Sequence, residues 1–284
     1  MSDAMALQSG KDHHGENFPV ASFLIAREAR APVLAFYRFA RFADDIADHA
    51  TAAPTDKLRL LEEMRQSLVG EGSASPEAIA LRRVLLERDL SDQHALDLLE
   101  AFRRDVTKLR YRDWDELMEY CRYSAMPVGR FVLDVHGESR DTWPANDALC
   151  AALQIINHLQ DCAKDYRNLN RVYIPEDALA AKGLDVTALA EAKAGPALKS
   201  VIAGLAVRNG LLLEQSRSFA RQIRDGRLAL EVDLIKTLAD DLNKMLGSRD
   251  PLSENVHHSK ARVAGLFVAR LPFFLLSRVR RGTR

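Results

Sequence analysis

The spacing of apolar residues constrains the fold of this 284-residue chain more than any other feature. Apolar residues recur at intervals of three and four almost throughout, as at Leu58, Leu61 and Leu68, which is the spacing of one face of an α-helix. No stretch alternates apolar and polar residues with enrichment in β-branched side chains. The pattern therefore predicts an all-α protein of about ten helices and no sheet.

The loops and the charge balance limit the domain organisation and the partners. The predicted loops are short, and none is rich in glycine and serine as a linker would be. We expect a flexible N-terminus over residues 1–14 and one helical domain over residues 15–284. The 40 basic and 40 acidic residues give a formal net charge of zero, whereas binding to a nucleic-acid backbone needs a basic excess. We therefore expect no nucleic-acid partner.

The N-terminus and the cysteines indicate a cytoplasmic protein. Residues 1–15 are polar and carry no apolar core of a signal peptide. The three cysteines, Cys121, Cys150 and Cys162, are odd in number and do not have the spacing of a zinc site. We interpret them as small apolar side chains of a reduced protein.

Local signals predict where several elements begin and end. Pro32 can open one helix, and Asn146 or Asp147 can cap another. A long helix over Trp114–His136 should kink or break at Pro127. We further expect an extended segment at Arg171–Pro175 and later helices at Pro196–Ile223, Leu228–Leu246 and Ser259–Arg278.

The C-terminal stretch Val263–Leu276 is apolar apart from Arg270. It is shorter than the roughly 20 residues that span a bilayer, and Pro272 interrupts it. We interpret it as a last core helix followed by a basic tail. The alternative is a peripheral contact with the inner face of a membrane, because basic and apolar residues lie together there.

Two acidic clusters lie inside predicted helices. Asp44, Asp45 and Asp48 form the first, and Asp161 and Asp165 form the second, so the outer aspartates of each are four residues apart. Residues i and i+4 share one face of a helix, where two carboxylates repel each other and resist burial. A divalent cation removes this conflict, and hard oxygen ligands suit Mg²⁺ together with water and substrate phosphate. The clusters predict a diphosphate held through Mg²⁺ between two helices.

Further polar residues share a stripe with each cluster. Tyr37 and Arg41 fall with Asp44 and Asp48 in an arc of about 60°, and Gln154 and Asn157 fall with Asp161 and Asp165 in an arc of about 80°. A solvated face, or a polar network in the core, would also explain such stripes. However, the first helix is apolar nearly all round, which is typical of burial, and buried charges need partners. This favours a ligand site.

Three linked motifs carry a resemblance to a known family. They are Tyr37-x3-Arg41-x2-Asp44-Asp45-x2-Asp48, then Tyr120-Cys121-Arg122-Tyr123-Ser124-Ala125-x2-Val128-Gly129, and finally Gln154-x2-Asn157-x3-Asp161-x3-Asp165 followed by Arg171-Val172-Tyr173. With these motifs in this order, about residues 15–278 resemble the squalene/phytoene synthase family of all-α isoprenoid synthases. The resemblance implies an isoprenoid-synthase-type bundle with a central apolar cavity.

The resemblance also implies roles at the matching positions. The Mg²⁺ ligands would come from Asp44, Asp45, Asp48, Asn157, Asp161 and Asp165. The groups near the diphosphate and the developing carbocation would be Arg41, Arg171, Tyr37, Tyr123 and Tyr173. The substrate chain would meet Phe18 and Gln154, and further candidates for substrate binding are His158 and Gln160.

Departures from the family pattern indicate one of its branches. Glu16 lies where the family commonly has a basic residue after the early histidine, and Gln160 lies where it usually has an arginine. Both weaken the case for joining two prenyl diphosphates. The pattern is most similar to the hydroxysqualene synthase branch of bacterial hopanoid pathways. That branch implies ionisation of presqualene diphosphate and capture of the rearranged cation by water.

Two alternatives stay open. One is head-to-head condensation of two prenyl diphosphates to presqualene diphosphate, squalene or phytoene. The other is a helical protein that binds isoprenoids or a partner enzyme without turnover, which the presence of all four outer aspartates disfavours. The resemblance also suggests association with other enzymes of hopanoid synthesis.

Overall fold

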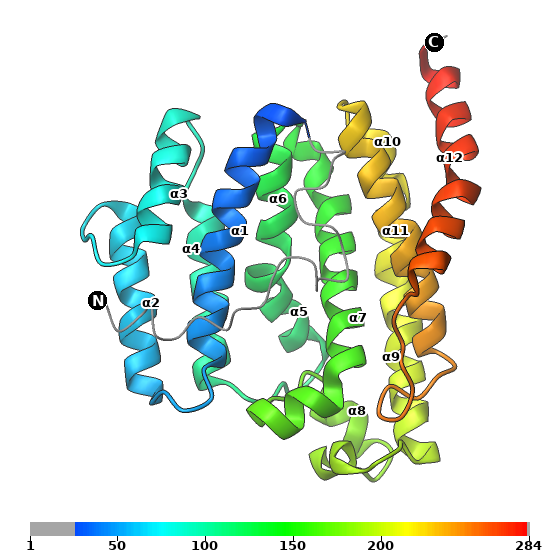
Figure 1. The fold of residues 1–284 in the computed structure, drawn as a ribbon. Helices are drawn as coiled ribbons and strands as arrows, with labels where there is room; N and C mark the ends of the chain where they lie inside the picture. Colours follow the sequence, from blue (N-terminus) through cyan, green and yellow to red (C-terminus); the bar gives the residue numbers. More distant parts are fainter. Residues whose placement is uncertain (1–25, 283–284) are drawn as a thin grey trace.

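The chain is helical throughout the part that the computed structural model describes, which is residues 26–282 without the side chains of 273 and 275–282 (Figure 1). No strand occurs in this part, so the predicted all-α class is confirmed. The predicted flexible N-terminus and Phe18 lie outside the described residues. The α-helices are α1 (Arg27–Asp48), α2 (Pro54–Val69), α3 (Pro76–Glu87), α4 (Gln93–Thr107), α5 (Trp114–Ser124), α6 (Met126–Val135), α7 (Trp143–Leu169), α8 (Glu176–Ala180), α9 (Pro196–Gln215), α10 (Phe219–Gln222), α11 (Gly226–Leu246) and α12 (Lys260–Gly282).

The start of α1 differs from the prediction. The helix begins at Arg27, so Pro32 lies inside it rather than at its start. Proline has no backbone N–H, and the carbonyl of Glu28, four residues earlier, therefore loses its donor within the helix. Arg88 donates from Nη2 to this carbonyl at 2.6 Å. A contact from outside the helix thus satisfies the group that proline leaves unpaired.

The break at Pro127 is as predicted, but the start of the next long helix is not. α5 ends at Ser124, and α6 begins with Pro127 in its first turn. The prediction that Asn146 or Asp147 caps α7 is wrong, because α7 begins at Trp143. Both side chains bind α6 instead: Asn146 donates to the Met126 carbonyl at 3.4 Å, and Asp147 accepts from Arg130 Nε at 2.8 Å.

α6 and α7 come unusually close at Gly129. A Cβ atom added there would lie 2.0 Å from Asn146 Oδ1 and 2.6 Å from Cys150 Sγ. Only a residue without a side chain fits this space. Glycine is unfavourable in a helix interior, so its presence here has a packing reason.

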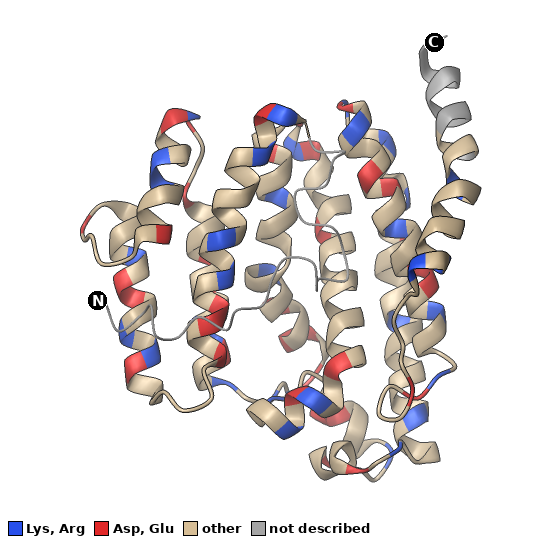
Figure 2. Cartoon of the chain, viewed as in Figure 1, with Lys and Arg blue, Asp and Glu red and all other residues tan. Residues whose placement is uncertain are grey.

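Two apolar clusters form the core, one on each side of the bundle. The first contains residues of α1, α2, α3 and α4 and also Phe131 of α6. The Phe131 ring stacks on Phe36 at a centroid distance of 4.0 Å. The second centres on α7, whose middle turns carry no charge (Figure 2), and which packs against α9 and α11. The functional pocket lies where helices of the two clusters meet.

α12 lies at the edge of the bundle against α11 (Figure 1). Phe274 is buried, and Arg270 forms a two-fold ion pair with Asp233 at 2.7 and 2.8 Å, which agrees with a last packed helix. However, Val263 and Val268 are 38% and 70% exposed. By length and composition, one described helical stretch, Pro196–Gln222 from α9 to α10, could cross a membrane, although the buried core helix of a bundle passes the same test.

Candidate active site

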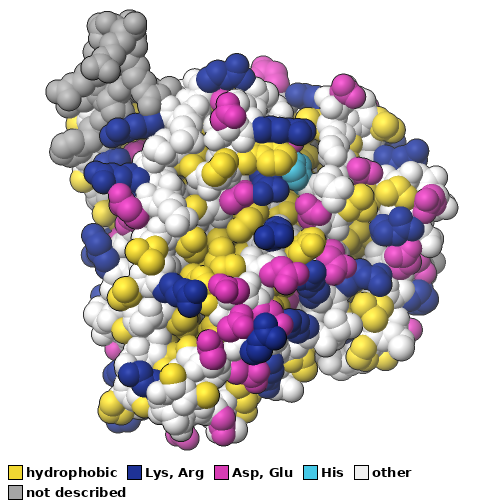
Figure 3. Space-filling model, turned by 180° about the vertical axis from the view of Figure 1, so that it is seen from behind, with side chains coloured by type: hydrophobic (Ala, Val, Ile, Leu, Met, Phe, Trp, Pro, Cys, Tyr) yellow, Lys and Arg dark blue, Asp and Glu magenta, His cyan; other side chains and the backbone are white. Residues whose placement is uncertain are grey.

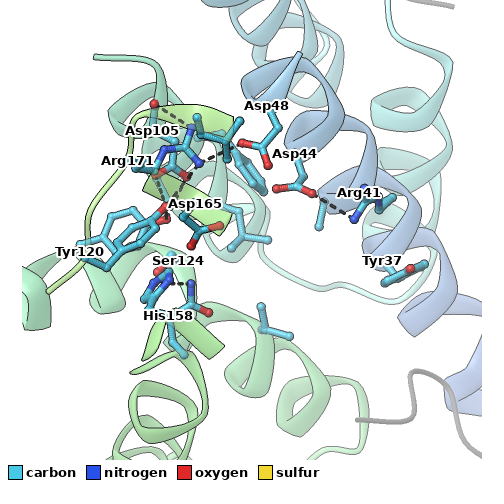
Figure 4. Close-up of a pocket in the computed structure, with 18 residues that line it drawn as sticks. Tyr37, Arg41, Asp44, Asp48, Asp105, Tyr120, Ser124, His158, Asp165 and Arg171 are labelled. Atoms are coloured by element: carbon cyan, nitrogen blue, oxygen red, sulfur yellow. Dashed lines mark hydrogen bonds and ion pairs between the residues drawn. The ribbon is translucent and has the colours of Figure 1, made fainter. Parts of the chain in front are cut away.

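A pocket of about 310 Å³ lies between α1, α4, α5, α6 and α7 (Figure 4). Several charged groups and one imidazole on its wall were predicted as site residues, namely Arg41, Asp44, Asp48, His158 and Asp165. Arg171, Tyr37, Gln154 and Tyr173 line it as well. The apolar part of the lining is Ala40, Leu98, Ala101, Phe102, Val128 and Leu169. The pocket thus combines a charged end with an apolar wall.

α1 presents one polar stripe to this pocket, as its helical spacing predicts. Tyr37, Arg41, Asp44 and Asp48 all line the wall, while phenylalanines on the other faces of α1 are buried in the core. Arg41 forms ion pairs with Asp44 at 3.1 Å and with Asp45 at 2.8 Å. Asp45 does not line the pocket, because its carboxylate is turned to the guanidinium. The structure therefore places Asp45 as a partner of Arg41.

α7 presents only part of its predicted stripe. Gln154, His158 and Asp165 line the pocket, whereas Asn157 and Asp161 do not. The Asp161 side chain is 41% exposed and lies 3.9 Å from Lys164. Gln160 lies on a different face of α7, where its amide donates to the carbonyl of Val256. This contact keeps Gln160 away from the pocket, so the structure gives it a packing role.

Arg171 links the two acidic helices. It follows α7 in the extended segment that the sequence predicts, and it donates to Asp48 of α1 at 2.9 Å and to the backbone carbonyl of Asp105 at 2.9 Å. Burial is energetically costly for the guanidinium, but Asp105, Asp48 and Tyr173 surround it and hold its pKa above the usual value. Asp44 and Asp48 of α1 and Asp165 of α7 therefore lie around a fixed cation (Figure 4).

Asp105 of α4 is a site residue that the sequence analysis missed. It accepts hydrogen bonds from Tyr120 at 2.9 Å and Tyr173 at 3.0 Å, and burial raises its pKa to about 6 although Arg171 opposes the shift. A signal was present in the sequence. Asp105 falls on the same face of α4 as the buried Leu98 and Ala101, where a carboxylate needs partners.

Aromatic rings form one side of the pocket. The imidazole of His158 stacks on Tyr173 at a centroid distance of 3.4 Å, and the ring of Tyr120 lies 6.0 Å from it. Burial, and then the charge of Arg171, lower the pKa of His158 to about 3, so the ring is neutral at physiological pH. Tyr123 lies elsewhere, with Arg104 over its ring at 4.2 Å, and it does not line the pocket.

The carboxylates at the charged end carry more negative charge than the arginines neutralise. Burial, followed by repulsion from Asp48, raises the pKa of Asp44 to about 7, and burial followed by repulsion from Asp161 raises that of Asp165 to about 7. The Asp44 side chain is 36% exposed and lines the pocket. Both helices also direct their C-terminal ends here, which adds negative potential. A divalent cation would relieve all of these interactions.

The donor set fits a magnesium ion that is shared with a ligand. Among the described residues, no three carboxylate, histidine or cysteine groups converge closely enough to hold a metal by themselves. Mg²⁺ is usually held by one or two carboxylates and completes its shell with water and substrate phosphate. Asp44, Asp48 and Asp165 could serve in this way. Figure 3 shows the molecule from behind, relative to Figure 1. On this face, apolar surface is bordered by acidic and basic side chains.

Comparisons with known proteins agree with this geometry. A family model described as squalene/phytoene synthase matches residues 11–264. The chain is 58% identical to a hydroxysqualene synthase of Rhodopseudomonas palustris over 257 residues, which cover 90% of this chain and 88% of that protein. It is 55% identical to a hydroxysqualene synthase of Zymomonas mobilis, over 94% of this chain and 91% of that protein.

Two solved structures have the same arrangement of helices. The squalene synthase HpnC from Alicyclobacillus acidocaldarius superposes with a TM-score of 0.72 at 31% identity, covering 86% of this chain and 91% of that one. A dehydrosqualene synthase in complex with a ligand superposes with a TM-score of 0.77 at 24% identity, covering 97% of both chains. The second likeness concerns the fold alone.

Proposed function

Because the chain belongs to the squalene/phytoene synthase family, we propose that it acts as a hydroxysqualene synthase, converting presqualene diphosphate and water into hydroxysqualene and diphosphate. Membership makes it an enzyme of prenyl diphosphates, and its high identity to hydroxysqualene synthases favours this reaction within the family. The observation that carries the proposal is the convergence of Asp44, Asp48 and Asp165, from helices far apart in the sequence, on one pocket with Arg41 and Arg171.

The reaction begins with the departure of the diphosphate. The C–O bond of presqualene diphosphate breaks, and the diphosphate leaves with the electron pair. Arg41 and Arg171 would bind its oxygens and offset the charge that develops there. Bound Mg²⁺, held by Asp44, Asp48 and Asp165 with Asp161 and Asn157 nearby on α7, would supply further charge neutralisation. The buried position of Arg171 strengthens its attraction for an anion.

The carbocation that remains is then stabilised and shielded from bulk water. The faces of Tyr120 and Tyr173 and the neutral ring of His158 can stabilise a positive charge without reacting with it. Phe102 and Leu98 line the apolar wall and exclude bulk water while the carbon skeleton rearranges. A water molecule finally forms the new C–O bond and loses a proton.

One experiment tests the proposed reaction. Purified protein is incubated with Mg²⁺ and presqualene diphosphate, or separately with farnesyl or geranylgeranyl diphosphate, and the lipid products are identified by mass spectrometry. We expect hydroxysqualene from presqualene diphosphate alone. Presqualene diphosphate, squalene or phytoene formed from the shorter substrates would show head-to-head condensation instead. No product from any of them would show a non-catalytic protein.

We also propose that α12 contacts the inner face of a membrane. Val263 and Val268 are exposed on a helix that also carries Lys260 and Arg262, which is the combination that binds an anionic lipid surface. A substrate that is insoluble in water would be delivered from such a surface. In a flotation assay, the protein should rise with anionic vesicles and the Val268→Asp variant should not. Equal flotation of both proteins would contradict the contact.

A cytoplasmic location and association with other hopanoid-pathway enzymes remain predictions.

A further inference from the structure

A polar cluster lies in the pocket away from its aspartates. The side-chain amide nitrogen of Gln154 lies 3.0 Å from His158 Nε2, one turn further along α7. Both side chains line the pocket, and their only hydrogen bond within the described part of the chain is the one between them. The carbonyl oxygen of Gln154 therefore has no donor among the described residues.

Ser124 adds an unpaired hydroxyl to the same pocket. Its Oγ is buried and has no hydrogen-bond partner among the described residues. Ser124 lies one turn after Tyr120 on α5, and the ring of Tyr120 contacts that of His158. α5 packs against α7, and Figure 4 draws Ser124 beside His158. Buried hydroxyl groups normally have a partner, so this one calls for a molecule that the protein itself does not supply.

The surroundings of the cluster suit a small neutral ligand. The imidazole is held in place by its stacking on Tyr173 at 3.4 Å and by the amide of Gln154. The Ser124 hydroxyl can donate to a water molecule and the Gln154 carbonyl oxygen can accept from it, which leaves one lone pair of that water free to react. No carboxylate of the described chain hydrogen-bonds to any of the three side chains. The cluster itself therefore presents neutral groups to a ligand.

We propose that Ser124, Gln154 and His158 hold the water molecule that captures the rearranged cation. This inference rests on the proposed function and adds the groups that position its second substrate. A lone pair of the held water forms the C–O bond, and the proton that the new oxonium group loses passes to the departed diphosphate. Gln160, which the sequence also suggested, is excluded by its contact with the Val256 carbonyl.

The product distribution reports directly on this water. If the water is missing, the same cation can end its lifetime by losing a proton from a neighbouring carbon to the diphosphate, and the C–H electron pair then forms a C=C bond. The product is a hydrocarbon instead of an alcohol. A residue that merely supports the fold would change the rate or the amount of active protein and would leave the ratio of the two products unchanged.

The test uses the full chain with presqualene diphosphate in H₂¹⁸O, with diphosphate release measured alongside the products. Ser124→Ala removes only the hydroxyl, and His158→Phe keeps an aromatic ring against Tyr173 while removing its nitrogens. We expect the alcohol-to-hydrocarbon ratio to fall about tenfold in each, which corresponds to the loss of one hydrogen bond in the capture step. Diphosphate release should continue.

Matched controls use buried residues of the same types outside the pocket. His94→Phe removes a buried histidine that pairs with Asp134, and Ser67→Ala removes a buried hydroxyl between α2 and α3. Both should keep the ratio of the unaltered chain. An unchanged ratio in Ser124→Ala and in folded His158→Phe would overturn the water site. If the unaltered chain releases no diphosphate at all, the proposed function itself fails, which is a separate result.

Discussion

Replacing Gly129 with alanine should separate α6 from α7 and destabilise the protein. The added methyl group would lie 2.0 Å from Asn146 Oδ1 and 2.6 Å from Cys150 Sγ, whereas unbonded carbon contacts are favourable only near about 3.5–4.0 Å. Asn146 cannot simply turn away, because it also donates to the Met126 carbonyl and to Asp147. The helices must therefore move apart by roughly 1 Å or more.

The size of this effect follows from two opposing contributions. Overpacking of a closely packed site is destabilising by about 1–3 kcal/mol, and the better helix propensity of alanine offsets about 1 kcal/mol of that. The separation of α6 and α7 would also strain the Arg130–Asp147 ion pair, which lies beside the contact. The two contributions leave a loss of about 0–2 kcal/mol. With the strained ion pair we expect the upper end, about 2 kcal/mol, or a melting temperature lower by roughly 4–8 °C for a protein of this size.

Thermal and urea unfolding followed by circular dichroism would measure the change, and Gly204→Ala is the matched control. Gly204 lies inside α9 with no atom within 4 Å of an added Cβ, so alanine there should stabilise by about 0.5–1 kcal/mol. Val128 lines the pocket beside Gly129, so turnover should fall in Gly129→Ala as well. Equal stability of Gly129→Ala and the unaltered chain, or similar destabilisation in both variants, would refute the packing argument.

Four further predictions concern the charged end of the pocket. Asp44→Asn or Asp165→Asn removes a proposed Mg²⁺ ligand, so turnover should fall at least about 100-fold. Each change also removes a carboxylate that its neighbours repel, so the melting temperature without Mg²⁺ should stay equal or rise. Full turnover in both variants would contradict their metal role. The pKa values of Asp44 and Asp165 rise from 3.8 to about 7 on folding, so the folded protein keeps protons that the unfolded chain releases above about pH 4. Without metal, the free energy of unfolding should therefore fall as pH rises from about 4 to about 7. Mg²⁺ competes with those protons, so it should raise the melting temperature more at pH 8 than at pH 5, and a shift independent of pH would argue against binding at these carboxylates. Asp105→Ala leaves the Arg171 guanidinium buried without its main counter-charge. This variant should be destabilised by about 3–5 kcal/mol in urea unfolding, and Asp105→Asn should be less affected. A loss below about 1 kcal/mol in the alanine variant would show that the remaining partners of Arg171 suffice.

Most of the fold followed from local sequence signals. The helical class and the break at Pro127 depend on the chemistry of adjacent turns, and both were predictable. The two wrong helix starts have non-local causes. Arg88 reaches the Glu28 carbonyl and allows Pro32 inside α1, and the binding of Asn146 to α6 removes it from a capping role. Neither contact is visible in the spacing of one segment.

The candidate site was predictable only as far as helical geometry reaches. The stripe of Tyr37, Arg41, Asp44 and Asp48 needs nothing beyond 100° per residue, and it is found whole on the pocket wall. On α7 the same rule placed Asp161 with Asp165, but the Asp161 side chain is 41% exposed and lies 3.9 Å from Lys164, and only Asp165 of the two lines the pocket. Helical spacing gives the face of a residue but not the direction in which its side chain finds a partner.

The amino-acid sequence by itself determined that this chain forms helices, which faces of them carry carboxylates, and to which family it belongs, because these properties depend on residue order along a few turns. The tertiary structure alone decided which carboxylates meet across the pocket, that Asp105 and Ser124 join them, and that Gln160 does not. Those outcomes depend on how helices distant in sequence pack together, since a side chain enters a site only when the helix opposite leaves room for it.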